Sequence, residues 1–379
     1  MKTSALSLLL CSLLLVPTYS EARTWFVRQD GSGDCTTIQA CINLASANDT
    51  VLTGPGTYFE NLTISTPITL VGELGAMQTI IDGGGGYTRC ITCSHATGRV
   101  YLVGLTITHG GVPDLCPPNN TGGGVVCISA ELEIRGCRIL SNFGGGVGCR
   151  SGSSVTVTDC YIADNFGWWG DPCMARGDGI LGDGATGTVL RCTINNPEAG
   201  GIYWFHGSLS AAENDLHGNA IGIVLDCTDN ATISQNLIRS GGTGISAILS
   251  NVSIVSNTVV GVVGSGRDGI SLYDCAGLIS NNIVALGAGH GIDCSGGGTI
   301  SCNNVWSNAA GDYYGYCQHP LDISIDPLFC DPSSGDFRLD CMSPCANYPG
   351  CGQIGAFGVG CGPTTVVETT WGKIKVLFR

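Results

Sequence analysis

A signature that recurs about every 22 residues constrains this chain more than any other feature of its sequence. A glycine followed by valine or isoleucine opens each unit, at Gly124, Gly146, Gly179, Gly201, Gly222, Gly244, Gly269 and Gly291. The steps between these glycines are 22, 33, 22, 21, 22, 25 and 22 residues. A repeat of this length is one structural unit that buries its apolar residues against its neighbours.

Apolar and polar residues alternate within each unit, which is the periodicity of β-strands. Three short strands and three turns fill such a unit, which makes it one coil of a parallel β-helix. Leucine-rich repeats have a similar period but need a consensus that is missing here, and helical repeats are longer. The sequence therefore predicts an all-β fold, a right-handed parallel β-helix of about ten coils over residues 60–310.

An asparagine or cysteine occupies one fixed place in these units. Stacking of the coils would align them in one inward column, which comprises Cys137, Cys160, Cys192, Asn214, Asn236, Asn257, Asn282 and Asn303. Each amide could then bond the backbone of the next coil and satisfy polar groups that a buried turn would leave without partners. We expect a structural role for this column.

Both ends of such a coil need a cover, because an open coil exposes unpaired strand edges. Residues 23–59 contain a short amphipathic helix, expected at 34–42, which would close the bore with a disulfide between Cys35 and Cys41. Residues 311–362 carry six cysteines and are expected to form a disulfide-rich C-terminal cap. The sequence leaves the pairing of those six open.

Residues 1–22 have the pattern of a secretory signal peptide: Lys2, an apolar run over residues 5–16 and small residues near the expected cleavage point. No stretch is long enough for a transmembrane helix. The 22 cysteines fit an oxidising compartment, and with Cys11 in the leader an odd number remains, so at least one thiol lacks an internal partner. We expect a secreted protein, either extracellular or at the cell surface.

The charge and the cysteine spacing exclude several kinds of partner. A net charge of −14 provides no basic footprint, so we expect no nucleic acid. Cys90 and Cys93 lack a second pair at zinc-ribbon spacing, and the calcium-binding nonapeptide is absent. We therefore expect no metal and no cofactor.

Segments at both ends of the repeat region carry a family resemblance. They are Thr36–Gln39, Asp49–Val51, Gly54–Tyr58, Ile68–Gly72, Asp326–Phe329, Ser343–Cys345 and Ile354–Gly358. In these segments the chain resembles the right-handed β-helix proteins of the pectin-lyase-like superfamily, specifically its secreted bacterial repeat proteins. The superfamily hosts several chemistries, so the resemblance implies a fold and not an activity.

No complete catalytic motif of that superfamily is found. The aspartate pair of the pectin methylesterases does not follow Gly104–Ile107. Gly289-His290-Gly291 matches a polygalacturonase element without its upstream aspartates, and is most simply a unit start after a surface histidine. Pectate lyases need calcium-binding carboxylates and a basic catalyst, but the repeat region has no lysine and no arginine in their motif. The Asp-Pro-His element of alginate epimerases is also missing. The catalytic residues, if any, stay unknown.

Two units exceed the period by about ten residues, and insertions are where a repeat protein can form a binding site. They span His109–Thr121 and Asp164–Gly177 and leave from the same corner. The predicted binding surface beside the second consists of Trp168, Trp169, Asp171, Arg176, Asp178, Asp183 and Tyr203. Aromatic rings beside carboxylates suit sugar rings; the alternative is a loop that packs its own tryptophans against the wall.

Three functions stay open. The leading one is binding of extracellular polysaccharide; the alternatives are a polysaccharide-degrading hydrolase or lyase, and a structural or adhesin-like surface protein without a catalytic site. Residues 363–379 form a linker and a tail that resembles the short endings on exported proteins of some Gram-negative bacteria. The tail is predicted to serve in sorting or surface attachment, or else to be a last strand or helix on the cap.

Overall fold

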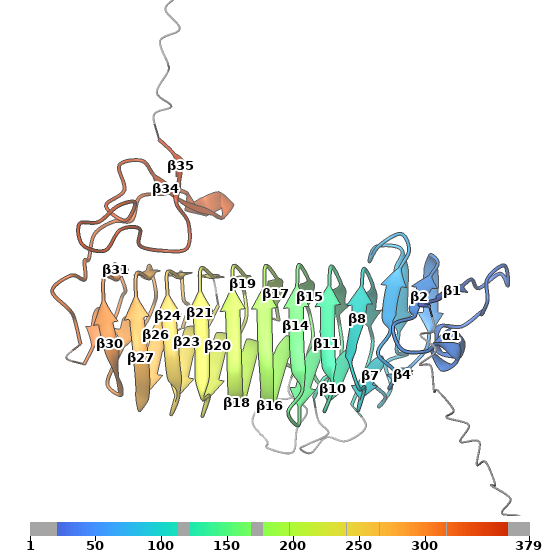
Figure 1. The fold of residues 1–379 in the computed structure, drawn as a ribbon. Coiled ribbons are helices and arrows are strands. Elements are labelled where there is room, and N and C mark those ends of the chain that lie inside the picture. Colours follow the sequence, from blue (N-terminus) through green and yellow to red (C-terminus); the bar gives the residue numbers. More distant parts are fainter. Residues whose placement is uncertain are drawn as a thin grey trace, which may run out of the picture.

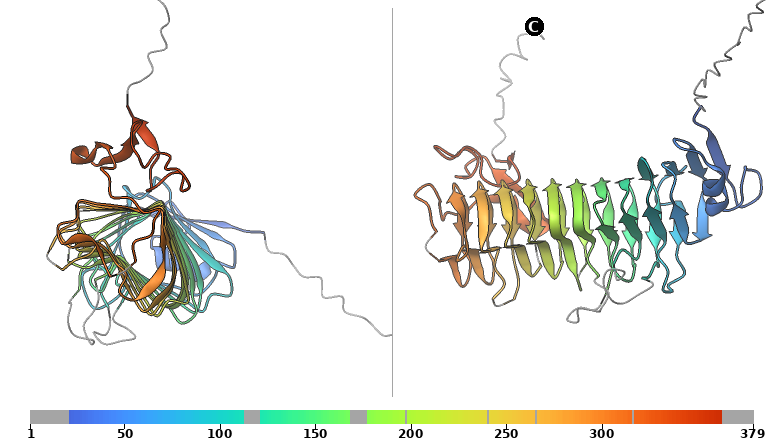
Figure 2. Two further views of the ribbon diagram at one scale, coloured as in Figure 1. Left: turned by 90° about the vertical axis from the view of Figure 1, so that its left-hand side faces the viewer. Right: turned by 60° about the horizontal axis from the view of Figure 1, so that its bottom comes forward.

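The computed structural model describes residues 21–112, 121–167, 177–196, 198–239, 241–264, 266–315 and 317–362. Within them the chain winds into an elongated parallel β-helix with three faces (Figures 1 and 2). The fold class predicted from the repeat is confirmed. Among the described residues, no helix is long and apolar enough to cross a membrane.

The first and second faces belong to one 21-stranded sheet. The first face contains β4 (Leu62–Ile64), β7 (Ile91–Ser94), β10 (Val125–Ile128), β13 (Val147–Arg150), β16 (Ile180–Leu190), β18 (Gly200–Ala212), β20 (Ile221–Asp226), β23 (Thr243–Ile248), β26 (Ile270–Tyr273), β29 (His290–Asp293) and β32 (Gly311–Tyr314). The second contains β1 (Thr24–Val27), β2 (Thr50–Thr53), β5 (Thr69–Gly72), β8 (Arg99–Val103), β11 (Glu131–Arg135), β14 (Ser154–Thr158), β21 (Asn230–Ser234), β24 (Asn251–Val255), β27 (Cys275–Ser280) and β30 (Gly297–Ser301). Strands β16 and β18 run through both faces and join them, since they pair over ten positions.

The third face is an 11-stranded sheet. Its strands are β3 (Gly56–Phe59), β6 (Thr79–Asp82), β9 (Thr106–Thr108), β12 (Arg138–Leu140), β15 (Tyr161–Ala163), β17 (Thr193–Asn195), β19 (Asp215–His217), β22 (Leu237–Arg239), β25 (Thr258–Val260), β28 (Ile283–Ala285) and β31 (Asn304–Trp306). The predicted count of about ten coils is therefore wrong. Coiling already begins with β1, β2 and β3, in a segment where the repeat signature is not visible.

The inward asparagine column is confirmed. Asn214, Asn236, Asn257, Asn282 and Asn303 are all at most 2% exposed. In the first four, the backbone N–H and the side-chain amide both donate to Oδ1 of the next asparagine, as at Asn257, whose two nitrogens lie 2.9 and 3.0 Å from Oδ1 of Asn282. Asn303 ends the column and donates in the same way to Oδ1 of Asp322. Cys192 joins the column, since its N–H donates to Asn214. The ladder therefore ties consecutive coils together from inside.

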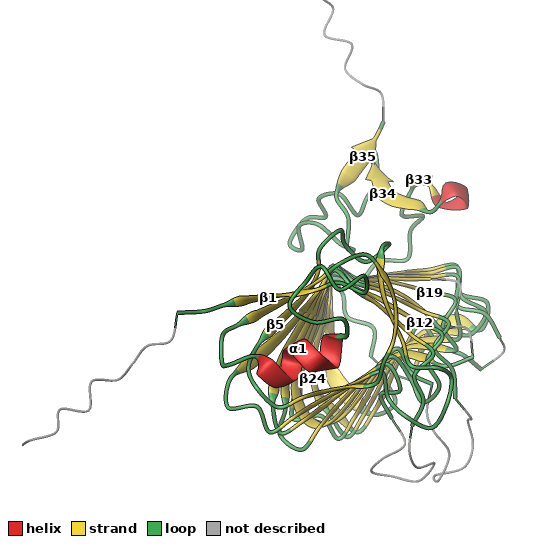
Figure 3. Ribbon diagram, turned by 90° about the vertical axis from the view of Figure 1, so that its right-hand side faces the viewer, coloured by secondary structure: helices red, strands yellow, loops and turns green. Residues whose placement is uncertain are grey.

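Helix α1 (Ile38–Leu44) lies across the N-terminal opening of the coil (Figure 3). Its buried side chains, Ile38, Cys41 and Ile42, are part of the interior. The carboxylate of Glu60 accepts the N–H groups of Ile38 and Gln39 and so satisfies two donors at the helix start. The predicted disulfide Cys35–Cys41 is present, so the expected N-terminal cover is confirmed.

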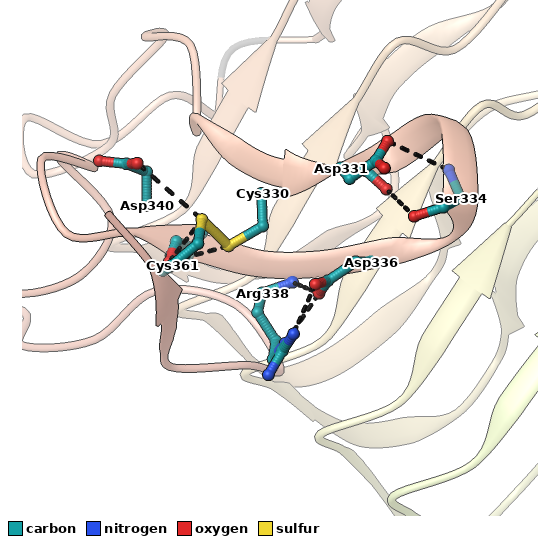
Figure 4. Close-up of polar contacts among 8 residues, drawn as sticks. Cys330, Asp331, Ser334, Asp336, Arg338, Asp340 and Cys361 are labelled. Carbon is teal, nitrogen blue, oxygen red and sulfur yellow. Dashed lines mark hydrogen bonds and ion pairs between the residues drawn. A yellow bond between two sulfur atoms is a disulfide. The ribbon is translucent and has the colours of Figure 1, made fainter. Parts of the chain in front are cut away.

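The C-terminal segment, residues 317–362, packs on the outer side of the third face, near the last coils (Figure 1). Its small sheet contains β33 (Phe329–Asp331), β34 (Asp336–Asp340) and β35 (Val359–Cys361), with a 3-10 turn at Pro332–Ser334. Cys330 and Cys361 form a disulfide inside this sheet, beside an ion pair of 2.6 Å between Asp336 and Arg338 (Figure 4). Two further disulfides, Cys294–Cys317 and Cys302–Cys351, attach the segment to the coil.

Many of the described cysteines are thiols rather than disulfides. Cys93, Cys127 and Cys149 stand in register on three consecutive coils of the first face, and each is fully buried. Cys137, Cys160 and Cys192 form the second such column, as predicted, and are also buried. Thiols are small and weakly polar, so they can fill an interior that must not bury unsatisfied polar groups.

Candidate functional site

Strands β16, β18 and β20 place five polar and aromatic side chains together on the outside of the first face. Asp183 pairs with Phe205, and Phe205 with Asp226, so these three occupy one row on consecutive coils. Coils are about 4.8 Å apart. Tyr203 lies two residues before Phe205 and therefore points the same way, and His206 follows at the corner. We call Asp183, Tyr203, Phe205, His206 and Asp226 the outer shelf.

A buried tryptophan fixes the orientation of the shelf. Trp204 alternates with Tyr203 and Phe205, and its side chain points inward and is 1% exposed. Its indole N–H donates to the carbonyl of Ala185 at 3.2 Å. The ring lies against Gly182 and Gly187, where a Cβ atom would meet ring carbons at 2.4 and 2.2 Å. Those two glycines make the space for the indole, so a one-residue shift of β18 would bury the shelf residues instead.

Contacts within the shelf hold its polar groups in place. The Tyr203 hydroxyl donates to Oδ2 of Asp226 at 3.3 Å. Nδ1 of His206 lies 3.8 Å from Oδ1 of Asp183, and its ring centroid is 3.9 Å from that of Phe205. The side chains of Asp183 and His206 are about half exposed, at 48% and 53%. The shelf thus offers two carboxylates and aromatic rings to solvent.

Two buried arginines border the shelf. Arg150 precedes Asp183 in the same row but is only 5% exposed, because its Nε donates to Oγ1 of Thr121 at 3.1 Å. Arg89 donates to the Thr121 carbonyl at 3.3 Å. Burial lowers the pKa of both guanidinium groups. The nearby charge of Arg150 lowers the pKa of Arg89 further, to about 10. The end of the first insertion therefore lies over β13, and it covers the arginines.

A second asparagine ladder supports the corner from which both insertions leave. Asn142, Asn165, Asn196 and Asn219 are buried, and each of the first three donates its N–H to Oδ1 of the next, at 3.1, 2.9 and 2.7 Å. Sequence reasoning missed this ladder. The available signal was an asparagine four or five residues after the first column, at three coils where that column holds cysteine and at the coil of Asn214.

Known proteins share the fold of this chain. The family model described as the right handed beta helix region matches residues 178–321. A crystal structure of the pectate lyase Pel9A superposes with a TM-score of 0.54 at 14% identity, over 90% of this chain and 97% of that one. The chain has the right-handed parallel β-helix fold that this pectate lyase also shows. At this identity the likeness shows the fold alone.

Two other solved β-helices superpose with lower TM-scores. A periplasmic alginate epimerase gives a TM-score of 0.41 at 15% identity, over 77% of this chain and 69% of that one. The catalytic domain of a GH87 alpha-1,3-glucanase, in complex with nigerose, gives 0.42 at 13%, over 76% and 66%. No curated protein matches the chain.

The β-helix places the predicted site residues in three different ways. Asp183 and Tyr203 lie on the outer shelf. Asp178 is buried inside the corner, where its Oδ1 accepts the N–H of Gly200 at 3.0 Å, so it shapes the start of β18. The rest of the predicted surface, Trp168, Trp169, Asp171 and Arg176, lies outside the described residues. Phe205, His206 and Asp226 complete the shelf; Asp226 was missed because it belongs to a later coil.

The described part of this β-helix provides no set of three metal-binding side chains. His290, the histidine of the Gly-His-Gly element, lies 3.3 Å from Asp268 and stacks near Tyr314. It is on β29, four strand pairings beyond β18 in the sheet. The His290–Asp268 pair therefore lies apart from the outer shelf.

Proposed function

We propose that the outer shelf binds a polysaccharide chain. The observation that carries the proposal is the row of Asp183, Phe205 and Asp226, with Tyr203 beside it. Aromatic faces stack against the C–H faces of sugar rings, and ionised carboxylates accept hydrogen bonds from hydroxyl groups. Successive coils repeat at about 4.8 Å, so a glycan chain that lies along the coil axis would meet the members of this row one after another.

Two further observations support this proposal. The pectate lyase with the same fold is a protein that, by its name, acts on pectate, so such a scaffold can serve polysaccharide recognition. Four described disulfides fit an oxidising compartment, where extracellular polysaccharides are met. Export through residues 1–22 and surface attachment through residues 363–379 are part of the proposal.

A glycan-array screen of the full chain, followed by affinity electrophoresis on any hit, tests the proposal. The Tyr203→Ala, Phe205→Ala double variant should lose glycan retention at nearly unchanged thermal stability, because both rings point outward. Tyr161→Ala is the matched control, since Tyr161 is exposed on β15 of the third face. Equal retention by the double variant and the control would refute binding at the shelf.

Hydrolysis is a second candidate function. Asp183 and Asp226 are two coils apart in one row, which separates their backbones by about 9.6 Å. Inverting glycosidases hold two carboxyl groups roughly 6.5–9.5 Å apart, so the spacing is near that range. Release of reducing ends from a bound glycan, lost in both Asp183→Asn and Asp226→Asn, would favour an enzyme. Retention without release would favour a binding protein.

A further inference from the structure

We infer that the outer shelf selects a neutral polysaccharide and discriminates against polyuronates, an inference that rests on the proposed function. The inference depends on the sign of the charges that the shelf presents to a bound sugar. A neutral hexose chain presents hydroxyl groups only, whereas a polyuronate carries a carboxylate on each sugar. The shelf should distinguish these two classes by electrostatics, because the apolar faces of the rings are alike.

The charges that the shelf itself turns to solvent are carboxylates. The side chain of Asp183 is 48% exposed, and Asp226 is in the same outward row two coils on. Ionised carboxylates have acceptor sites and no donor. They therefore suit the hydroxyl donors of a neutral sugar, whereas a second carboxylate brought to the same place would find like charge and no donor.

Among the described residues, the two arginines that border the shelf point to Thr121 and do not fully compensate for that charge. Arg150 and Arg89 are 5% and 9% exposed, and both guanidinium groups donate to Thr121. Arg150, one coil before Asp183 in the same row, partly offsets the charge of Asp183. The partners described for the Asp226 carboxylate are uncharged: the Tyr203 hydroxyl and the Cys227 thiol. Arg267 is exposed, yet it precedes β26, two strand pairings beyond β20.

The remainder of the protein adds to the same selection. Its net charge is −14, so the long-range field slows the approach of a polyanion and does not steer it to the surface. Salt screens this field, with a Debye length of about 10 Å at about 0.1 M ionic strength. A polyuronate should therefore be disfavoured most at low salt.

The test compares one glycan in two charge states. A neutral glucan, mannan or galactan fragment taken from the array screen is titrated calorimetrically beside the same fragment oxidised at C6 to the uronate. We expect the oxidised fragment to bind at least about tenfold more weakly at low salt, a difference that corresponds to 1.4 kcal/mol. The difference in affinity between the two fragments should become smaller at high salt.

Charge-matched variants assign the effect to the shelf. The Asp183→Asn, Asp226→Asn double variant should reduce the difference in affinity between the two fragments several-fold. Glu131→Gln with Glu213→Gln removes the same net charge at two exposed positions away from the shelf and should leave this difference nearly as it was. Equal or tighter binding of the oxidised fragment, or equal narrowing in both double variants, would overturn the inference. Binding of neither fragment would refute the proposed function as well.

Discussion

Replacing Asn257 with leucine tests how much the inward ladder contributes to stability. Oδ1 of Asn257 accepts the backbone N–H and the side-chain amide of Asn236, at 3.0 and 2.9 Å. Its Nδ2 donates to the Ile233 carbonyl at 2.8 Å and to Oδ1 of Asn282 at 3.0 Å. Leucine has a similar size and can do none of this, so the polar groups of two neighbouring coils lose a fully buried partner.

The magnitude follows from those lost contacts. Leaving a buried donor or acceptor without its partner costs about 1–3 kcal/mol, so the Asn236 N–H and the Ile233 carbonyl together cost about 2–6 kcal/mol. Burial of a leucine side chain returns about 1.5–3 kcal/mol. The middle of the first range less the middle of the second is about 2 kcal/mol, which is the expected decrease in the free energy of unfolding for Asn257→Leu.

Urea denaturation followed by far-ultraviolet circular dichroism measures this difference. Asn251→Leu is the control, because Asn251 is an exposed residue of the adjacent strand β24 and its replacement should stay within about 0.5 kcal/mol of wild type. If Asn257→Leu unfolded at the same urea concentration as the control, the ladder would not stabilise the coil and the reasoning would be refuted.

Two further predictions concern the interior. Gly182→Ala should lower the free energy of unfolding by about 1–3 kcal/mol, because the new Cβ would lie 2.4 Å from the Trp204 ring. Thermal unfolding checks this against the control Gly86→Ala, whose new Cβ meets no atom within 4 Å. Equal unfolding temperatures for the two variants would contradict the prediction. Stability should also fall as the pH rises from 9 to 11, since burial raises the pKa of Cys90 to about 12 and of Cys127 and Cys345 to about 11, against 9.0 for an ordinary thiol. Below pH 9 these thiols are protonated in the folded and in the unfolded state. Above pH 9 only the folded state keeps the protons, so the free energy of unfolding falls by about 1.4 kcal/mol per pH unit for each thiol. A flat urea midpoint between pH 8 and pH 10.5 would disprove the effect.

The repeat signature was sufficient to predict the coil, because strand alternation and a fixed asparagine position are both local patterns. The register of Asn214 to Asn303 followed from it, whereas the disulfide Cys35–Cys41 was predicted from the short helix at the N-terminal end. The first coils were undercounted because β1 to β3 bury different residues and lack the glycine signature. The packing of residues 317–362 along the third face depends on contacts between distant segments, which no local pattern records.

The candidate site was predictable only in part. The alternation of apolar and polar residues in β16 and β18 placed Asp183 and Tyr203 outside correctly. The burial of Asp178 depends on a hydrogen bond to Gly200, one coil later. The place of Asp226 depends on the pairing of β18 with β20. Such contacts across coils require the register of the whole sheet, which the sequence gives only approximately where coils differ in length.

Hydroxyl-radical footprinting of the wild-type protein, with and without a glycan from the array screen, tests polysaccharide binding at the outer shelf most directly. The account predicts that the glycan reduces oxidation of Tyr203 and Phe205. Oxidation of Tyr161 and Tyr273, exposed residues outside the shelf, should stay unchanged. Protection elsewhere on the coil, with Tyr203 and Phe205 oxidised as before, would contradict the account.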